Sequence, residues 1–505
     1  MKPALIPPVT KDMPSKERIM ELVRGGIYTL CFIGILIHLA ECYRLFYQVS
    51  KDEQISIALI FFVLMLMVIQ RVKLLNIPSL IVTVCFGILA FFGTRMYLFA
   101  PDLFPGRVLN GIVDLMVLLL ITDMAITKRV RRLNSMYLWL FALICLMTVI
   151  MQAIHPGTEP RIYLLLALFA LIPIKKKEHE IVLGGLLNAG LIVSVIAAFL
   201  SHVINPYTEI QKIWTGYLYK EAGAGIFCAL LTVLALLSII RAKEHYGRFG
   251  LCYLASCIWF GMTIVYAFLV GKINVFSGYI FLLLFLLVFG FRNTKSPRLI
   301  LRGCIALSCV FIVGYITLDL INIVASTQFE PRALHDVINK TPLRFFPGIA
   351  NRIVSRIIVF AGKRVSSYYL GNPVLSLINN IASGRIEQAT EILKTCSFTY
   401  STASYGRYST SHTGYLEPIY NYGYLAGIMN VVFYVSCFIT AIVRYVKEKK
   451  FEFLSAVALG ALMFGIWLGE AEPATAPLMF VVLIVFVPCM WKDGNERKKQ
   501  SKESE

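Results

Sequence analysis

The sequence predicts an all-α, polytopic membrane protein with about 14 transmembrane helices and one large, partly helical extracytoplasmic loop. Two observations carry this prediction. The chain of 505 residues is 58% hydrophobic and only 15% charged, whereas about a quarter of the residues of a soluble protein are charged. Apolar runs of about 20 residues, the length that crosses a bilayer as a helix, recur along the whole chain.

The apolar runs define the predicted spans. They cover residues 27–47, 55–70, 78–99, 110–126, 136–154, 161–174, 181–204, 224–240, 251–271, 275–291, 299–321, 424–446, 453–471 and 473–491. The run at 161–174 is short for a span. About 25 polar and basic residues precede the first run, and because that run leads into further spans we expect no cleavable signal peptide.

Basic residues follow the spans with a regular parity. Alternate loops carry clusters of Lys and Arg, such as 128–132, 175–177 and 447–450, and the opposite loops carry few. Because cytoplasmic loops are enriched in Lys and Arg, both termini are predicted to be cytoplasmic. The predicted regions are a cytoplasmic segment at 1–26, eleven helices within 27–321, an extracytoplasmic loop at 322–423, three helices within 424–491 and a cytoplasmic tail at 492–505. Topology thus accounts for most of the formal charge of +19, and no nucleic-acid partner is expected.

The extracytoplasmic loop at 322–423 departs from this parity, because it holds ten Lys or Arg against five Asp or Glu. Long loops cross the membrane regardless of their charge, so topology permits this excess without explaining it. A positively charged surface on the outer face attracts negatively charged molecules. The loop is therefore predicted to bind an anionic ligand.

Two segments of the loop are predicted to be helical. Residues 347–370 are amphipathic, and Arg352 and Arg356 are four residues apart on one face of the predicted helix. A helix lying on the outer leaflet would place both side chains at the depth of lipid headgroups. Residues 383–395 form a second predicted helix with Ser383 as its N-cap. Arg385 then lies near a helix N-terminus, where free backbone N–H groups favour anions.

The stretch from 410 to 427, TSHTGYLEPIYNYGYLAG, closes the loop and leads into an apolar run. The positions His412, Leu416, Ile419 and Gly423 are spaced to share one helical face. Pro418 predicts a kink or a late helix start, because it disfavours the helical conformation at the residue before it. Gly423 and Gly427 form a small-xxx-small pair, which predicts the close approach of another span.

This stretch resembles the O-antigen ligase/polymerase superfamily. The string His-Thr-x-Tyr-Leu-x-x-Ile-x-x-x-Gly at 412–423 is similar to the His-Asn-x-Tyr-Leu…Gly signature of that family, with Thr413 where Asn is usual. Ser383-Gly384-Arg385 resembles a family element that opens a helix earlier in the same loop. The last two spans, separated by GEAEPATAP at 469–477, also look like the family's ending. The resemblance covers roughly 320–490, and the first 300 residues match only in hydropathy and topology.

The resemblance implies a GT-C-like glycosyltransferase of the bacterial cytoplasmic membrane. Its donor would be a glycan linked to undecaprenyl pyrophosphate, moved en bloc to a sugar hydroxyl on the outer face. The acceptor would be another lipid-linked repeat in a polymerase or a terminal glycan in a ligase, and the number of spans fits a polymerase better. The resemblance implies neither a metal nor another cofactor. Besides the bilayer, other polysaccharide-assembly proteins are candidate partners.

The chemistry of this transfer assigns candidate roles to particular residues. The departing pyrophosphate needs cations, and the guanidinium of arginine matches phosphate oxygens in pairs. The candidates for this contact are Arg385, Arg352, Arg356 and Arg95. The attacking hydroxyl needs a base, for which His412 and then Glu417 are the candidates. Candidate glycan contacts are Arg332, Arg344, Tyr415 and Glu470.

The sequence also permits other interpretations of these residues and of the function. His412 could cap a helix, Arg352 and Arg356 could anchor a helix to headgroups, and Arg95 could extend to the interface. A lipid-linked oligosaccharide flippase is an alternative function of another class. Such a transporter would show two related halves and intramembrane charges, and the sequence shows no related halves. A structural or sensory membrane protein is a third reading without specific support.

Overall fold

The computed structural model describes six helical stretches and several short pieces. The described residues are 15–44, 176–204, 221–246, 251–270, 389–390, 392–394, 396, 415–467 and 485–486, with single positions at 61, 64, 65, 111, 115, 117, 118, 121, 122, 139, 143, 146 and 218. This part of the chain is almost entirely helical and contains no β-strand, as the sequence predicts. The predicted helix at 347–370 lies outside it.

Each of the six helices overlaps a predicted span. They are α1 (Ser15–Arg44), α7 (Lys176–Ile204), α8 (Glu221–Tyr246), α9 (Leu251–Val270), α16 (Glu417–Glu448) and α17 (Phe451–Trp467). Three segments are long and apolar enough to cross a bilayer: 178–201 in α7, 223–242 in α8 and 423–448 in α16. These helices indicate a membrane protein. The eight predicted spans that none of these six helices overlaps lie wholly or largely outside the described residues.

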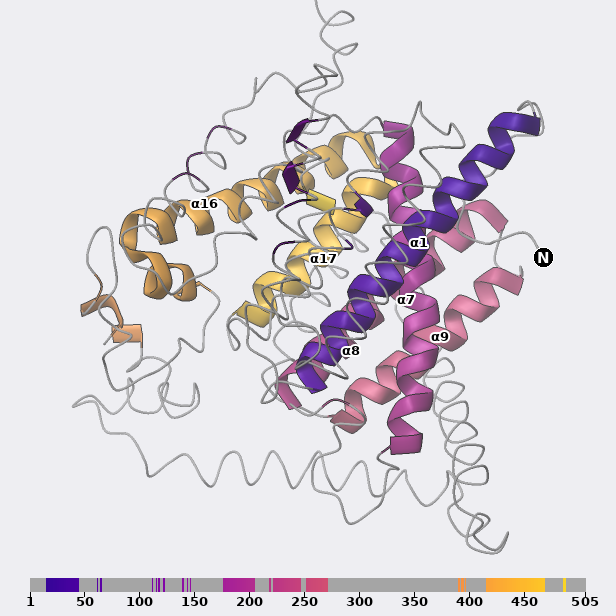
Figure 1. Cartoon of the computed structure of the whole chain (residues 1–505), viewed down its shortest axis with the longest axis horizontal. Helices are drawn as coiled ribbons and strands as arrows, with labels where there is room; N and C mark the ends of the chain where they lie inside the picture. The colour runs from indigo at the N-terminus through magenta and orange to yellow at the C-terminus, as the bar shows by residue number, and fades with distance from the viewer. Residues whose placement is uncertain are drawn as a thin grey trace, which may run out of the picture.

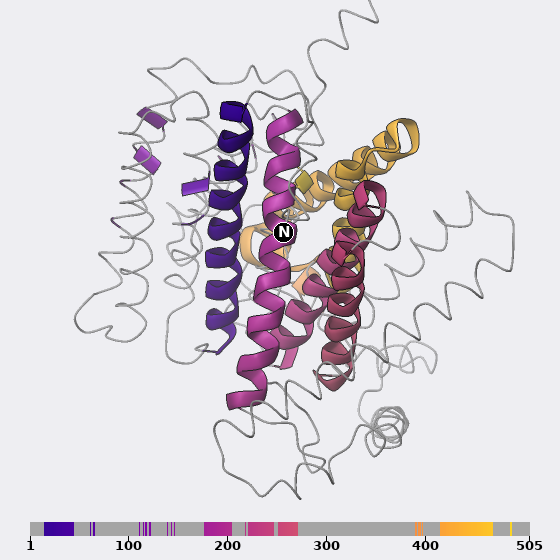
Figure 2. The same ribbon diagram turned by 90° about the vertical axis from the view of Figure 1, so that its right-hand side faces the viewer.

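The helices α1, α7, α8 and α9 pack into one bundle, with α16 and α17 beside it (Figure 1). Figure 2 shows α1 and α7 standing side by side. Their close approach depends on Gly185, because a Cβ there would lie 2.8 Å from the Cβ of Tyr28 and 3.1 Å from the backbone nitrogen of Thr29. A Cβ at Gly190 would likewise lie 2.8 Å from a methyl carbon of Leu234 on α8. Small residues thus let neighbouring helices meet at backbone distance.

Replacing Gly185 by valine is expected to separate α1 from α7 and to lower the thermal stability of the purified protein. Overpacking typically costs about 1–3 kcal/mol, and here the obstacle includes backbone that cannot rotate away. The measurement is the melting temperature in detergent. The matched control is Gly26→Val on α1, where a Cβ meets nothing within 4 Å. Equal melting temperatures for the two variants would contradict the predicted packing.

Charged side chains gather at one end of the bundle. Glu178 on α7 accepts a hydrogen bond from the Tyr28 hydroxyl and lies 3.7 Å from Arg24 Nη1 on α1. The guanidinium of Arg241, near the end of α8, lies 5.6 Å from the ring centre of Phe451, the first residue of α17. The N-terminal half of α1 therefore lies at the start of α7, and the end of α8 lies at the start of α17. These are the helix ends that the Lys and Arg parity assigned to one side of the membrane.

Candidate functional site

The segment at 415–423, here called the return segment, leads from the predicted outer loop into the apolar stretch at 423–448. Its helix begins at Glu417 with Leu416 as the N-cap, and Pro418 occupies the first turn, where its missing N–H costs no helical hydrogen bond. The helix breaks at Gly423, whose φ of 81° and ψ of 178° are essentially restricted to glycine. Of the two outcomes predicted at Pro418, a kink or a late helix start, the structure shows a helix start, and the kink lies at Gly423.

The kink folds the return segment back against its own helix. A Cβ at Gly427 would lie only 2.5 Å from the Cα and backbone nitrogen of Ile419. Figure 1 shows this first part of α16 turning beneath the rest of the helix. A neighbouring span was predicted to pack closely on Gly427. This prediction was wrong about the partner, because the positive φ at Gly423 turns the chain so that Ile419 of α16 itself packs there. The single helical face predicted from His412 to Gly423 is also wrong, because α16 begins only at Glu417 and its helical geometry is interrupted at Gly423.

The end of the predicted loop helix packs on the return segment. Residues 389–390 and 392–394 are helical, as the prediction for 383–395 requires. The buried contact consists of Ile392, Cys396, Ile419 and Tyr420, with Leu416 and Tyr424 packed against it. The Tyr424 hydroxyl donates a hydrogen bond to the carbonyl oxygen of Leu393, and the Cys396 thiol donates to the carbonyl oxygen of Ile419 at 3.6 Å. Two segments of the predicted outer loop thus form one packed unit.

Tyr415 attaches this unit to α17. Its hydroxyl donates to the carbonyl oxygen of Phe464 at 2.8 Å. Its ring stacks on Phe464 at 6.2 Å between centres and meets the edge of Trp467 at 5.6 Å. Tyr415 precedes the apolar span that begins at Gly423, and burial raises the pKa of its phenol to about 12. The phenol is therefore neutral near pH 7 and serves as a donor rather than as a base.

The structure places two of the candidate site residues. Tyr415 has the contacts above, and its phenolic oxygen can also accept a hydrogen bond from a sugar. Glu417 is the first residue of α16. The other candidates lie outside the described residues: His412, Arg385, Arg352, Arg356, Arg95, Arg332, Arg344 and Glu470. The structure brings together two segments: residues 392–396, which follow Arg385 in the sequence, and residues 416–424, which follow His412.

Sequence reasoning missed the residues that join these segments. Ile392 and Cys396 are four residues apart and so share one face of the predicted loop helix, which was the available signal. Nothing in the sequence pointed to the Tyr424 hydroxyl as their partner. Among the described residues, no group of three or more His, Cys, Asp or Glu side chains is arranged to hold a metal ion.

No family model matches the chain, and no curated protein or solved structure matches it. The proposed role of the site therefore rests on its residues, their packing and the motifs at 383–385 and 412–423.

Replacing Ile392 by alanine is expected to loosen the loop helix from the return segment. Truncating a buried isoleucine costs about 2–5 kcal/mol, because both the transfer free energy and the packing are lost. The measurement is the rate of limited proteolysis within 322–423 in the reconstituted protein, which should rise. The control is Leu393→Ala, because the neighbouring Leu393 is 44% exposed and contributes little packing. Equal cleavage rates in both variants would contradict the docking of this helix.

Proposed function

We propose that the protein is a membrane glycosyltransferase that lengthens a surface polysaccharide, such as an O-antigen, a capsule or an exopolysaccharide. Its donor is a glycan linked to undecaprenyl pyrophosphate, and it transfers this glycan en bloc to a sugar hydroxyl on the outer face of the bacterial cytoplasmic membrane. The observation that carries the proposal is the packing of residues 392–396 on the return segment. This contact joins the segment that follows Arg385 to the segment that follows His412, which are the two motifs of the family resemblance.

In the proposed reaction His412 removes the proton from the acceptor hydroxyl as its oxygen attacks the anomeric carbon of the donor. The bond from that carbon to the phosphate oxygen breaks, and undecaprenyl pyrophosphate leaves with the electron pair. Arg385, assisted by Arg352, Arg356 and Arg95, stabilises the charge that develops on the leaving group. Each such charged hydrogen bond contributes about 1.5–3 kcal/mol. Glu417 orients His412 or binds a sugar hydroxyl.

The packing of the return segment supports this division of roles. Tyr415 stays protonated and holds its segment on α17, and the base that we propose is His412, three residues earlier. A base must be held within hydrogen-bond reach of the proton that it removes. Two hydrogen bonds restrain the return segment near its ends: Tyr415, its first residue, bonds to Phe464, and Tyr424, the residue after it, bonds to Leu393.

The test is to incubate the purified full-length protein with an undecaprenyl-pyrophosphate-linked glycan, alone and with a candidate acceptor, and to analyse the products by mass. Chain growth without an added acceptor identifies a polymerase. A single transfer that requires the acceptor identifies an enzyme of the ligase type, which would use the same site. Movement of the donor across a reconstituted bilayer without a new glycosidic bond would overturn the proposal in favour of a flippase.

A further inference from the structure

The turn between α16 and α17 has an unusual backbone. The helix α16 ends at Glu448 and α17 begins at Phe451, so two residues reverse the chain. Lys449 adopts the left-handed conformation with a φ of 51°, and its backbone N–H bonds to the carbonyl oxygen of Tyr445. Glycine usually occupies this position at the end of a helix, because a side chain is disfavoured there. The sequence instead keeps a cation at a strained position, which is a feature of functional sites.

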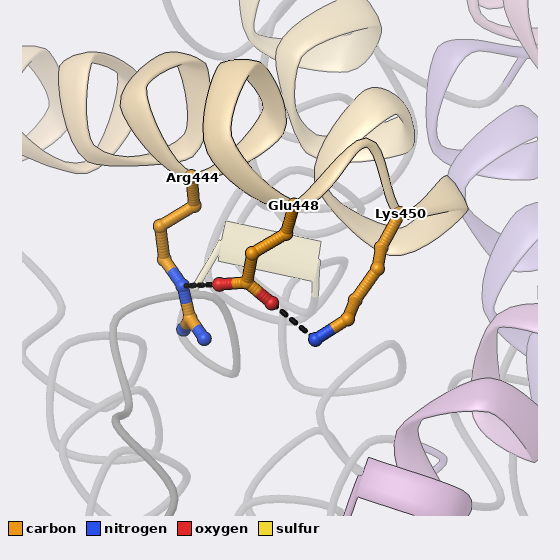
Figure 3. A network of polar contacts seen from close by, with 3 residues as sticks. All are labelled: Arg444, Glu448 and Lys450. Atoms are coloured by element: carbon orange, nitrogen blue, oxygen red, sulfur yellow. Dashed lines mark hydrogen bonds and ion pairs between the residues drawn. The ribbon is translucent and has the colours of Figure 1, made fainter. Parts of the chain in front are cut away.

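The charges of this turn form an ordered arrangement (Figure 3). The carboxylate of Glu448 accepts hydrogen bonds from Arg444 Nε at 3.1 Å and from Lys450 Nζ. The Arg444 guanidinium also lies 4.3 Å from the ring centre of Phe453. Lys447 and Lys449 are exposed and have no ion pair within the described part of the chain. From 444 to 450 there are four cations and one carboxylate, a net charge of +3.

An apolar stripe on α16 leads to Lys447. Ile428, Val432, Val435, Ile439 and Val443 lie at helical spacing and are 36–54% exposed. Lys447 follows Val443 by four residues, so it lies one turn further along the same side. The helix segment from 423 to 448 is long and apolar enough to cross a bilayer, which places the turn at a membrane interface. An apolar stripe that ends in exposed cations matches a lipid with apolar chains and an anionic headgroup.

We propose that this turn binds the phosphate headgroup of an anionic phospholipid, whose acyl chains lie along the α16 stripe. Lys447 and Lys449 contact the phosphate. Glu448 does not repel it, because Arg444 and Lys450 already neutralise the carboxylate. A free phosphate ion would use the lysines alone and would gain nothing from the stripe. The alternation of Lys- and Arg-rich loops predicts that this turn lies on the cytoplasmic side, so the bound lipid belongs to the cytoplasmic leaflet.

The test compares the full-length protein with the double variant Lys447→Gln/Lys449→Asn. Asparagine tolerates the left-handed conformation, so the second change removes a charge without adding backbone strain. Binding of phosphatidylglycerol is measured by titrating it into protein in neutral detergent and counting bound lipids by native mass spectrometry. The expected loss of affinity is about fivefold per lysine, or about 25-fold for both, since each lysine near a membrane surface contributes that factor.

The matched control is Lys498→Gln/Lys499→Gln, which removes two charges from the tail predicted to lie on the same side. This variant should bind phosphatidylglycerol as the wild type does. Phosphatidylcholine and inorganic phosphate are the other arms, and neither should compete with phosphatidylglycerol at equal concentration. Equal affinity of the wild type and the Lys447→Gln/Lys449→Asn variant would overturn the proposal. Full competition by inorganic phosphate would replace the lipid with a simple phosphate site.

Discussion

The His412→Ala substitution is expected to abolish chain extension by the proposed enzyme while the protein still reaches the membrane. The physical reason is that the acceptor hydroxyl then has no base to take its proton as it attacks the anomeric carbon. Loss of a positioned general base reduces a rate by about 10²- to 10⁴-fold. The measurement is glycan length from purified protein and lipid-linked donor, together with the amount of protein in the membrane fraction.

Arg385→Ala should have a comparable effect through the leaving group, and Arg385→Lys should restore only part of the activity, because an ammonium lacks the paired donors of a guanidinium. The controls remove the same side-chain types on the side predicted to be cytoplasmic, with His245→Ala and Arg248→Ala. Wild-type glycan length from both the His412 and the Arg385 variants would refute the site assignment. Loss of activity in the control variants would instead indicate a general defect in folding.

The Gly427→Ala substitution is expected to displace the return segment and to cause a large loss of both stability and activity. The new Cβ would lie 2.5 Å from two backbone atoms of Ile419, which cannot move without shifting the packed unit. Overpacking of this kind costs about 1–3 kcal/mol. A displacement of about 1 Å in the segment that follows the proposed base can cost ~100-fold in rate. The measurements are the melting temperature and the rate of transfer from the lipid-linked donor.

Two further glycine variants separate the packing effect from that of the substitution itself. Gly423→Ala should behave like Gly427→Ala, because its φ of 81° and ψ of 178° strain any residue with a Cβ. Gly26→Ala should leave stability unchanged or raise it, because its site is open and alanine favours a helix. If Gly427→Ala melted and reacted like Gly26→Ala, the reversed geometry of the return segment would be wrong.

The positions of the helices could be predicted because each depends on a local property of the chain. The predicted spans 181–204, 224–240 and 251–271 lie within or within one residue of α7, α8 and α9. An apolar run long enough to cross a bilayer forms a helix because its backbone groups must be satisfied within the segment. The grouping of charged helix ends was also foreseeable, because Lys and Arg mark alternate loops.

The candidate site could be predicted only as a set of residue types in a particular loop. A histidine, an arginine beside a helix start and a glycine near an apolar run could each be read from the sequence. The arrangement of the segments that follow the arginine and the histidine could not, because the residues in contact are distant in the chain. The hydrogen bonds that hold the return segment span 23, 31 and 49 residues. No local periodicity encodes which partners such side chains will find.

The sequence by itself determined an α-helical membrane protein, the positions of its described helices and the residue types available for chemistry. Only the tertiary structure decided that Gly427 receives Ile419 of its own helix, that Tyr424 holds the loop helix and that Tyr415 is fastened to α17. The physical reason lies in one dihedral angle. Glycine permits a positive φ at residue 423 but does not require it, and the packing of the return segment selects it.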